Sequence, residues 1–378
     1  MFYKNARIFT SDFRFHTGAF AVRDGLFGEV LPENVPADAV DLNGATVIPG
    51  LIDVHSHGNS GADFSDGDYE GLKRMAAFYA RCGVTSFAPA SMTLPYDVLE
   101  KAFATARQLH AEAPEGLSRL MGIQMEGPYF SYKKRGAQNP DYLKNPDFEG
   151  FQKLYEGCGG LIRIVDVAPE LPGAAEFVAK AKDLCTVSIA HTDSDYDHAR
   201  AAIDAGATHL THLYNAMTPM HHRKPGVVTA ALRSNVYTEM ICDTIHVHPA
   251  MFQFVMDCKG KDKFVLITDC MRAGGMPQGE YTLGELKVVV DETSARLMDG
   301  TLAGSILTLN KAIDNVHKNT NKPLWEIVSA ASLNPARAMG MQDRIGSLRA
   351  GCNADFAVFD DDFNTQMTIV DGRVVYKK

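Results

Sequence analysis

The run Val47-Ile48-Pro49-Gly50-Leu51-Ile52-Asp53-Val54-His55-Ser56-His57-Gly58 decides the fold of this chain. It begins as a β-branched, apolar strand and ends in two histidines that one residue separates. Because residues i and i+2 of an extended strand lie on the same face, we expect His55 and His57 to point the same way. Paired imidazoles at the end of a buried strand suit the binding of one divalent metal ion.

Seven further apolar runs follow this one, and Ala-rich amphipathic segments separate them. The alternation is typical of βα units around a parallel sheet. The eight predicted strands are Val47–Val54, Val84–Pro89, Leu120–Gln124, Ile162–Val167, Cys185–Ala190, Thr208–Thr211, Tyr237–Cys242 and Phe264–Thr268. The predicted helices include Tyr69–Cys82, Val98–Ala111, Ala174–Leu184, Asp197–Ala205, Pro249–Cys258, Leu307–Lys318 and Trp325–Ala331. Eight strands favour an α/β fold of the (β/α)8, TIM-like barrel type.

The two ends of the chain carry short alternating segments with hairpin signals, Asp24-Gly25 near the start and Asp371-Gly372 near the end. Neither end has room for a hydrophobic core of its own. We therefore predict a small β-sandwich domain formed by 1–46 and 341–378, beside a metal-dependent barrel catalytic domain over 47–340. A β-rich insert is predicted at Tyr281–Leu302.

Composition excludes several classes of protein. The chain has 378 residues, enough for a barrel of roughly 250 residues and a small companion domain. Its formal net charge of −9 leaves no excess of Lys and Arg for nucleic acid or an anionic membrane. The seven cysteines are odd in number, which argues against a disulfide framework. Since no run approaches the roughly 18 apolar residues of a membrane span, we expect a soluble, cytoplasmic protein.

Polar residues stand directly after five of the predicted strands. They are His55, His57, Glu126, His191, His212 and Asp269. The carboxyl ends of barrel strands meet at one mouth, so we expect these side chains to form a single site. Any one of them alone is more often a hydrogen-bonded core residue. Together the imidazole and carboxylate groups predict a divalent metal site, for Zn²⁺ first, with Fe²⁺, Co²⁺ or Mn²⁺ also admissible.

The chain resembles the amidohydrolase superfamily, and within it the N-acetylglucosamine-6-phosphate deacetylase family. The first strand quoted above resembles the superfamily signature. The closer resemblance lies in the stretches Glu126–Tyr129, Thr211–Met217, Asp243–Val247, Leu266–Asp269 and Leu302–Ser305, which run across almost the whole chain. Thr211–Met217 is specific to the deacetylase family. The resemblance implies hydrolysis of N-acetylglucosamine 6-phosphate to glucosamine 6-phosphate and acetate.

The resemblance also implies a metal-dependent mechanism. One ion is held by Glu126, His191 and His212. Members that keep the first-strand pair can hold a second ion with His55 and His57, bridged by Glu126, whereas other members lose the pair and work with one, so one or two ions per subunit stay open. Metal coordination lowers the pKa of bound water to near 7, so the implied nucleophile is a metal-bound hydroxide, with Asp269 as catalytic acid/base. Glu126 occupies the slot where dihydroorotase-like relatives have a carboxylated lysine, which favours the deacetylase branch.

A basic loop, Met220–Gly226, is expected to supply cations for a phosphate group. By resemblance, its Arg223 matches the family's phosphate-binding arginine, often supplied across a homodimer interface, and His222 stands beside it. The other implied substrate contacts are Ala137, Gln138, Asn215, Ala216, His246, Leu302, Ala303 and Gly304.

Gln138 departs from the family pattern, which commonly has a histidine there to polarise the substrate carbonyl. A glutamine amide still donates a hydrogen bond, but it cannot shift toward a charged donor. Two explanations stay open: a second metal ion compensates, or the preferred substrate differs.

Three alternative functions also stay open. A dihydroorotase-like hydrolase of cyclic amides would not need the Arg223 loop, so dependence of turnover on a phosphate separates it from the deacetylase. A different N-acetyl amino-sugar phosphate, such as the galacto or manno epimer, fits the same residues. A catalytically dead binding protein on the same fold would usually have lost metal ligands, and this chain keeps every candidate.

Overall fold

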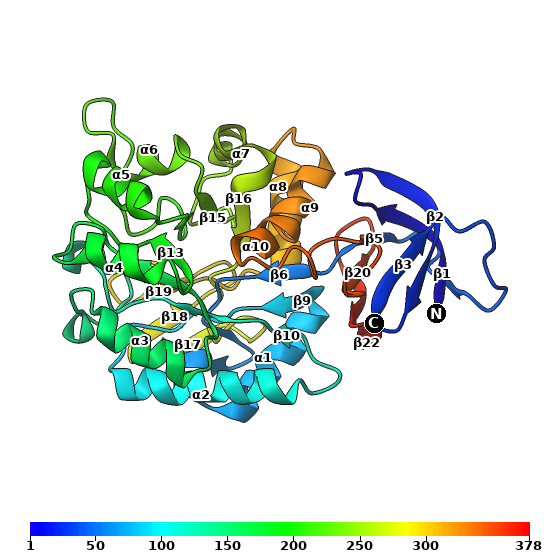
Figure 1. Ribbon diagram of the computed structural model, residues 1–378, viewed down its shortest axis with the longest axis horizontal. Coiled ribbons are helices and arrows are strands. Elements are labelled where there is room, and N and C mark those ends of the chain that lie inside the picture. The colour runs from blue at the N-terminus through cyan, green and yellow to red at the C-terminus, as the bar shows by residue number, and fades with distance from the viewer.

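In the computed structural model, which describes residues 1–378, a parallel-stranded α/β body adjoins a β-rich end piece (Figure 1). Both termini lie in the end piece, where strands from the two ends of the chain form one sheet. None of the helices combines the length and the apolar character that crossing a bilayer requires.

The α/β body contains parallel strands that follow one another in chain order. One sheet holds β6 (Leu51–Asp53), β9 (Val84–Phe87) and β10 (Arg119–Leu120). The other holds β11 (Ile123–Met125), β12 (Ile162–Val167), β13 (Thr186–Ile189), β14 (His209–Leu210), β15 (Tyr237–Ile241) and β16 (Phe264–Ile267). Each of the eight predicted runs overlaps one or two of these parallel strands.

Backbone contacts curl these two sheets toward each other. Ala90 forms a parallel bridge with Gln124, between the end of β9 and β11. At the other edges, the Asp269 amide donates to the His55 carbonyl at 2.9 Å and the His57 amide donates to the Cys270 carbonyl at 2.8 Å. The carboxyl ends of β6 and β16, the first and last parallel strands, are therefore neighbours.

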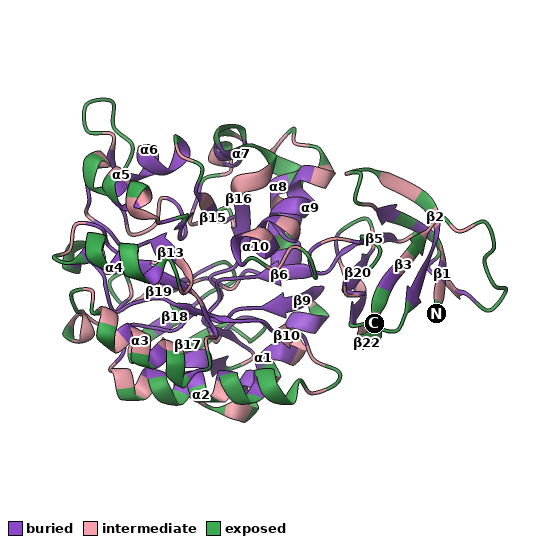
Figure 2. Ribbon diagram, in the orientation of Figure 1, coloured by how far each residue is buried: buried purple, intermediate pink, exposed green.

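The helices pack around the outside of the parallel strands, with their outer faces exposed and the strands buried (Figure 2). They are α1 (Tyr69–Arg81), α2 (Tyr96–Glu112), α3 (Phe148–Gly157), α4 (Ala174–Ala181), α5 (Tyr196–Ala205), α6 (Gly226–Leu232), α7 (Ala250–Lys263), α8 (Leu309–Asn319), α9 (Leu324–Ala330) and α10 (Leu333–Ala338). The sequence did not predict α3, α6 or α10. Most of α6 is buried, and a helix without a polar face has no amphipathic period to detect.

One sheet draws its strands from both ends of the chain. Its order is β22-β21-β20-β5-β1-β2-β3, with β4 (Val40–Asp41) paired to β1. The bounds are β1 Phe2–Phe9, β2 Phe15–Arg23, β3 Leu26–Val30, β5 Thr46–Pro49, β20 Phe356–Phe359, β21 Thr365–Val370 and β22 Arg373–Lys377. Two-residue turns at Asp24-Gly25 and Asp371-Gly372 connect its hairpins as predicted, and all four residues have the positive φ that such turns require.

The predicted strand Val47–Val54 is two strands, which corrects the sequence-based assignment. β5 pairs antiparallel with β20 in the terminal sheet, whereas β6 pairs parallel with β9. Between them the backbone of Gly50 passes so close to Thr85 that a Cβ there would lie 2.1 Å from its hydroxyl oxygen. Residues 47–49, which we assigned to the barrel, therefore pair in the terminal sheet.

The predicted insert after the last parallel strand is a three-stranded antiparallel sheet. It comprises β17 (Gly279–Leu283), β18 (Leu286–Val290) and β19 (Ala295–Leu297). A short hairpin that the sequence did not predict, β7 (Gly58–Asn59) with β8 (Ala62–Asp63), directly follows the first-strand histidines.

A buried carboxylate fastens the terminal sheet to the α/β body. Asp355, just before β20, accepts two hydrogen bonds from the Arg119 guanidinium of β10, at 2.6 and 3.1 Å. The Asp355 side chain is 2% exposed. Its carboxylate also accepts from the Asp371 amide at 2.8 Å, and Arg119 pairs with the Asp371 carboxylate at 2.7 Å.

We predict that Asp355→Ala lowers the free energy of unfolding by about 3 kcal/mol, because it leaves a largely buried guanidinium without its main partner. Urea denaturation measures this change. Glu115→Ala is the matched control, since it removes an ion pair with Arg373 whose two side chains are both exposed, and it should change little. Replacing both partners, Arg119→Met with Asp355→Leu, should recover most of the loss. Equal effects of Asp355→Ala and Glu115→Ala would contradict the prediction.

Candidate metal centre

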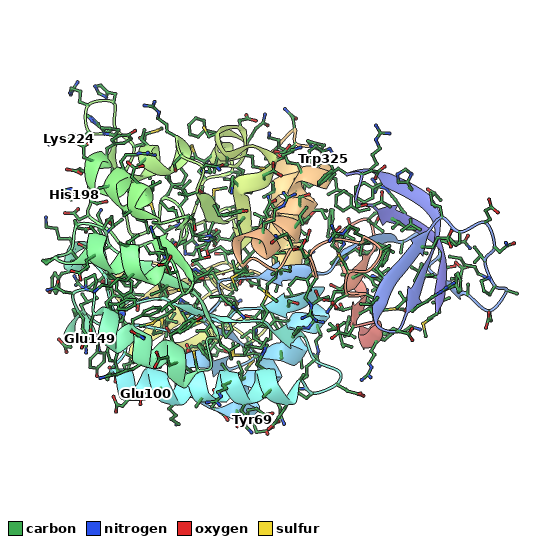
Figure 3. All side chains as sticks on the ribbon, viewed as in Figure 1. Tyr69, Glu100, Glu149, His198, Lys224 and Trp325 are labelled. Carbon is green, nitrogen blue, oxygen red and sulfur yellow. The ribbon has the colours of Figure 1, made fainter.

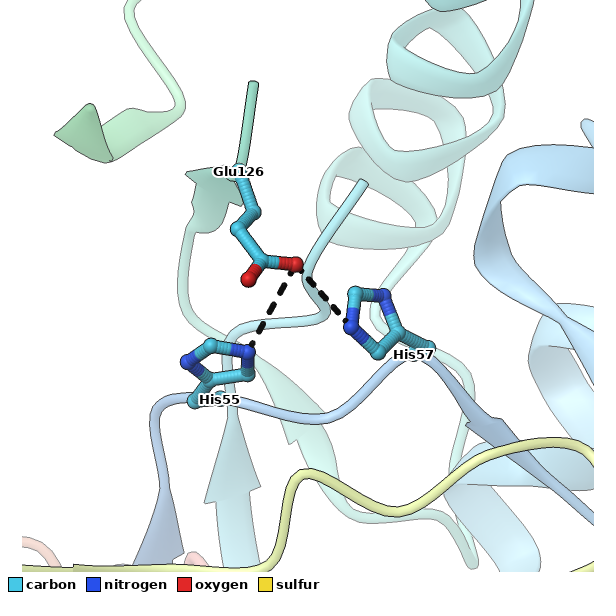
Figure 4. A group of neighbouring side chains, drawn as sticks. All are labelled: His55, His57 and Glu126. Carbon is cyan, nitrogen blue, oxygen red and sulfur yellow. Dashed lines mark ion pairs between the residues drawn. The ribbon is translucent and has the colours of Figure 1, made fainter. Parts of the chain in front are cut away.

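Glu126 stands at the centre of the site, with imidazoles on both sides of its carboxylate. Its Oε1 lies 3.0 Å from His191 Nε2 and 3.2 Å from His212 Nε2. Its Oε2 lies 3.0 Å from His57 Nε2 and 3.8 Å from His55 Nε2. Figure 4 shows the two first-strand histidines converging on this one oxygen. Each carboxylate oxygen therefore serves one pair of histidines.

The ends of four parallel strands position these residues, as the sequence predicted. His55 and His57 follow β6, Glu126 follows β11, His191 follows β13 and His212 follows β14. The last two leave their strands in the left-handed region, with φ of 43° and 30°. Such backbone is strained for a residue with a Cβ, and strain of this kind collects at functional sites.

The ligand atoms form two groups that suit a metal ion. His55, His57 and Glu126 make one group and Glu126, His191 and His212 the other, with the ligand atoms of each group within 4.8 Å of one another. All five side chains are buried. His55 Nε2 has no hydrogen-bond partner, and a buried polar atom without one is costly. Nitrogen and carboxylate donors in this arrangement fit a divalent cation.

The electrostatics of the site favour positive charge between the carboxylates. Burial lowers the pKa of His55, but the Glu239 and Glu126 carboxylates outweigh it and raise that pKa to about 10. Burial raises the pKa of Glu126, but His57 and His55 outweigh it and hold that pKa well below its usual range. A divalent cation supplies the same positive charge in place of protons.

Asp269, directly after β16, faces the first-strand histidines. Its Oδ1 lies 3.3 Å from His57 Nε2 and 3.7 Å from His55 Nε2. Burial raises the pKa of Asp269, but the hydrogen bond from His57 and the charges of both histidines outweigh burial. The net result is a pKa below the ordinary value. The group is therefore an ionised carboxylate that can accept a proton.

A cavity of about 330 Å³ opens above the ligands. Most of the predicted substrate contacts line it, namely Ala137, Gln138, Asn215, Ala216, His246, Leu302 and Gly304. Lys133 and Lys134 also line it, and we did not predict them. The signal was available, because these two lysines and Arg135 form a basic run shortly after the strand that carries Glu126.

The other three predicted contacts do not line the cavity of this chain. Ala303 is fully buried. His222 and Arg223 lie in an exposed loop, where the Arg223 guanidinium contacts His222 Nε2 at 2.6 Å. Lys224 of the same loop projects at the end of the molecule opposite the terminal sheet (Figure 3). The roles of His222 and Arg223 stay predictions.

Gln138 is held in a single orientation. Its Oε1 accepts from the Thr93 amide at 2.7 Å, and its Nε2 donates to Glu126 Oε2 at 3.1 Å. Because the Thr93 amide donates to the Oε1 end of the side chain, the NH₂ end faces Glu126, the carboxylate that the two groups of candidate ligands share. The amide thus donates to Glu126, and the role of Gln138 toward a substrate stays a prediction.

A buried carboxylate beneath the ligands escaped the sequence analysis. Glu239 of β15 accepts from His55 Nδ1 at 3.0 Å and from His209 Nε2 at 2.9 Å. Burial raises its pKa, but His55 and His209 lower it more, to about 2. The available signal was a charged residue inside the otherwise apolar run Tyr237–Cys242.

Comparisons with known proteins agree with this geometry. The profile of the Amidohydrolase family matches residues 46–375. The chain is 37% identical to N-acetylglucosamine-6-phosphate deacetylase of Bacillus subtilis (strain 168), over 99% of this chain and 96% of that protein. It is 33% identical to N-acetylgalactosamine-6-phosphate deacetylase of Escherichia coli O157:H7, over 93% of each.

A solved structure is similar over the whole length. It is a mutant N-acetyl-D-glucosamine-6-phosphate deacetylase from Mycobacterium smegmatis in complex with N-acetyl-D-glucosamine-6-phosphate. The TM-score is 0.94 at 32% sequence identity, covering 100% of this chain and 99% of that one.

We predict that Zn²⁺ binding to metal-free protein at pH 7 releases protons. The carboxylates hold the pKa of His55 at about 10, so its imidazole is protonated at pH 7, whereas a metal ligand must be neutral. The affinity should therefore rise with pH toward about 10 and fall as the pH is lowered. Isothermal titration calorimetry in two buffers of different ionisation enthalpy counts the protons. Identical heats in both buffers would contradict the prediction, and a His55→Asn variant should release fewer protons.

Proposed function

The chain belongs to the amidohydrolase family, and on that premise we propose that it hydrolyses N-acetylglucosamine 6-phosphate to glucosamine 6-phosphate and acetate. One observation carries the proposal: two groups of metal ligands share Glu126 and open into a cavity lined by the predicted sugar contacts. The relatives named as deacetylases of this sugar phosphate support the choice of substrate.

In this proposal one divalent ion is held by Glu126, His191 and His212, and a second by His55, His57 and Glu126. Zn²⁺ is the proposed ion, and Fe²⁺, Co²⁺ and Mn²⁺ suit the same ligands. When bound, the ion supplies Lewis acidity toward the amide carbonyl and acidifies water at the site. The hydrogen bond from Gln138 Nε2 to Glu126 Oε2 holds the shared carboxylate between the two groups.

Asp269 is the proposed acid/base. Its lowered pKa leaves the carboxylate ionised, and the side chain lines the cavity next to His57. It takes a proton from the attacking water and delivers it to the nitrogen of the amide as the carbon–nitrogen bond breaks. The proton is needed because an amine is a poor leaving group until it is protonated.

The cavity wall offers donors for the rest of the sugar phosphate. His246 is oriented by Asp243, which accepts from its Nδ1 at 2.6 Å, so Nε2 is left for a sugar hydroxyl. Asn215 and Ala216 are proposed contacts for the phosphate, and Leu302 and Gly304 line the same cavity. Lys133 and Lys134 add positive charge at the same rim.

Arg223 is proposed to reach the phosphate from the partner in a homodimer. The support is its position, because it lies in an exposed basic loop outside the cavity of its own chain. An anionic substrate in a chain of net charge −9 also needs a local source of cations.

The finer architecture belongs to the proposal too. The curl of the parallel sheet supports a closed (β/α)8 barrel over most of 47–340. A core cluster of 14 buried residues drawn only from the two ends of the chain, with Phe20, Phe27 and Phe356 among them, supports a separate β-sandwich domain of 1–46 and 341–378. Residues 47–49 join that domain by their pairing.

We predict that Asp269→Asn lowers kcat by on the order of 10²- to 10⁴-fold, the range for a lost acid/base. Acetate release from N-acetylglucosamine 6-phosphate is the measurement, on protein of known metal content. The same assay with N-acetylgalactosamine 6-phosphate ranks the epimers, and unphosphorylated N-acetylglucosamine tests for dependence on the phosphate. Turnover of neither sugar phosphate by metal-replete protein would refute the proposed reaction, and full activity of Asp269→Asn would remove the carboxylate from it.

We predict that Arg223→Ala raises KM roughly 10- to 100-fold, because a charge-assisted contact to the phosphate is lost. Lys224→Ala, in the same exposed loop, is the matched control. A mixture of Arg223→Ala and Asp269→Asn chains tests the dimer, since each mixed dimer rebuilds one intact site. At a substrate concentration well below KM, where Arg223→Ala is nearly inactive, co-expression should recover about a quarter of wild-type activity. An arginine that acts within its own chain should leave only the residual activity of Arg223→Ala.

A further inference from the structure

The four histidines of the metal centre differ in what orients them. His57 Nδ1 lies 3.2 Å from the Ala90 carbonyl oxygen, and His191 Nδ1 lies 2.9 Å from that of Lys134. His212 Nδ1 has no partner. His55 is the one histidine of the four whose Nδ1 contacts a charged group, the Glu239 carboxylate at 3.0 Å.

Glu239 is itself fixed from below. Its second oxygen accepts from His209 Nε2 at 2.9 Å, and all three side chains are fully buried. The His212 backbone amide adds a longer contact of 3.3 Å. His209 and Glu239 lie on the neighbouring strands β14 and β15, so the pair forms part of the rigid sheet.

We propose that Glu239, held by His209, is the positioning residue that makes His55 a metal ligand and so maintains the ion at His55, His57 and Glu126. By accepting from Nδ1–H, Glu239 fixes the tautomer in which Nε2 carries the lone pair, and Nε2 is the atom that faces Glu126 and Asp269. A carboxylate behind a ligating imidazole also makes that imidazole a stronger donor.

Glu239 acts on one of the two groups of candidate metal ligands, the group of His55, His57 and Glu126. Among the ligand side chains, Glu239 bonds only that of His55. His191 and His212 contact Glu126 Oε1 through their own Nε2 atoms, and neither side chain bonds Glu239. Loss of Glu239 therefore weakens the ion on the first-strand histidines and spares the ion on the other group.

This inference rests on the metal binding in the proposed function. Its test therefore measures metal binding instead of turnover. Glu239→Gln preserves the shape of the side chain but replaces one acceptor oxygen with a donor. Asp166→Asn on β12 is the matched control, because Asp166 is equally buried and bonds Gln124 and Thr211 rather than a metal ligand.

The experiment measures Zn²⁺ content by mass spectrometry and the dissociation constant of each ion by competition with a chelator. We expect two ions per chain in the wild type and in Asp166→Asn. In Glu239→Gln, one ion should bind roughly 10- to 100-fold more weakly and the other as before. Adding Glu239→Gln to a His57→Ala chain should change nothing further, because the weakened ion is already absent there.

His209 provides an independent route if Glu239→Gln does not fold. His209→Gln keeps an amide N–H for Glu239 and should retain the second ion, whereas His209→Leu should weaken it. Equal binding of both ions in Glu239→Gln and wild type would overturn the proposal, and so would equal weakening of both ions or a wild type that holds one ion. Turnover by a one-ion wild type would leave the proposed reaction standing, while a two-ion protein without turnover would refute the reaction alone.

Discussion

A single carboxylate shared by four imidazoles is the constraint on which the rest of the structure depends. Glu126 must be buried and ionised at once, and burial alone penalises a carboxylate heavily. Histidines at Oε1 and Oε2 compensate, but they come from three other strands. The strand ends can meet around Glu126 only because the parallel sheets curl until β6 and β16 are neighbours.

The same demand explains the polar layer under the site. Inward-facing positions of parallel strands are usually apolar, yet here Asp53, Gln124, Asp166 and Glu239 are fully buried. Each is hydrogen-bonded to a neighbouring strand; Asp53, for example, accepts from the Thr268 hydroxyl at 2.6 Å. Burial raises the pKa of Asp53 to about 7, so this layer is costly to maintain. Within this layer Glu239 accepts directly from His55 Nδ1, whereas Asp166 bonds Gln124 and Thr211.

The sequence predicted the structural features that a periodic pattern or a motif indicates. Local pattern, together with the rule that barrel strands end at one mouth, predicts the strand order, most helices, both hairpin turns and the five clustered candidate ligands. It could not predict features set by contacts distant in sequence. The division at Gly50 depends on the approach of Thr85, and the direction of the Gln138 amide depends on the Thr93 backbone. Glu239 looked like an isolated charge because its partners His55 and His209 lie on other strands.

The shared terminal sheet has a consequence for synthesis of the chain. β1 and β5 leave the ribosome before the α/β body, but β20, the strand that completes the hydrogen bonding of β5, emerges only after that body. Until then β5 presents an open edge, which is a template for unwanted pairing. The strand β6, which His55 and His57 follow, continues almost directly from β5. A nascent chain can therefore begin to assemble its α/β body while β5 is still unpaired on one side, and it remains vulnerable to aggregation until β20 has been made.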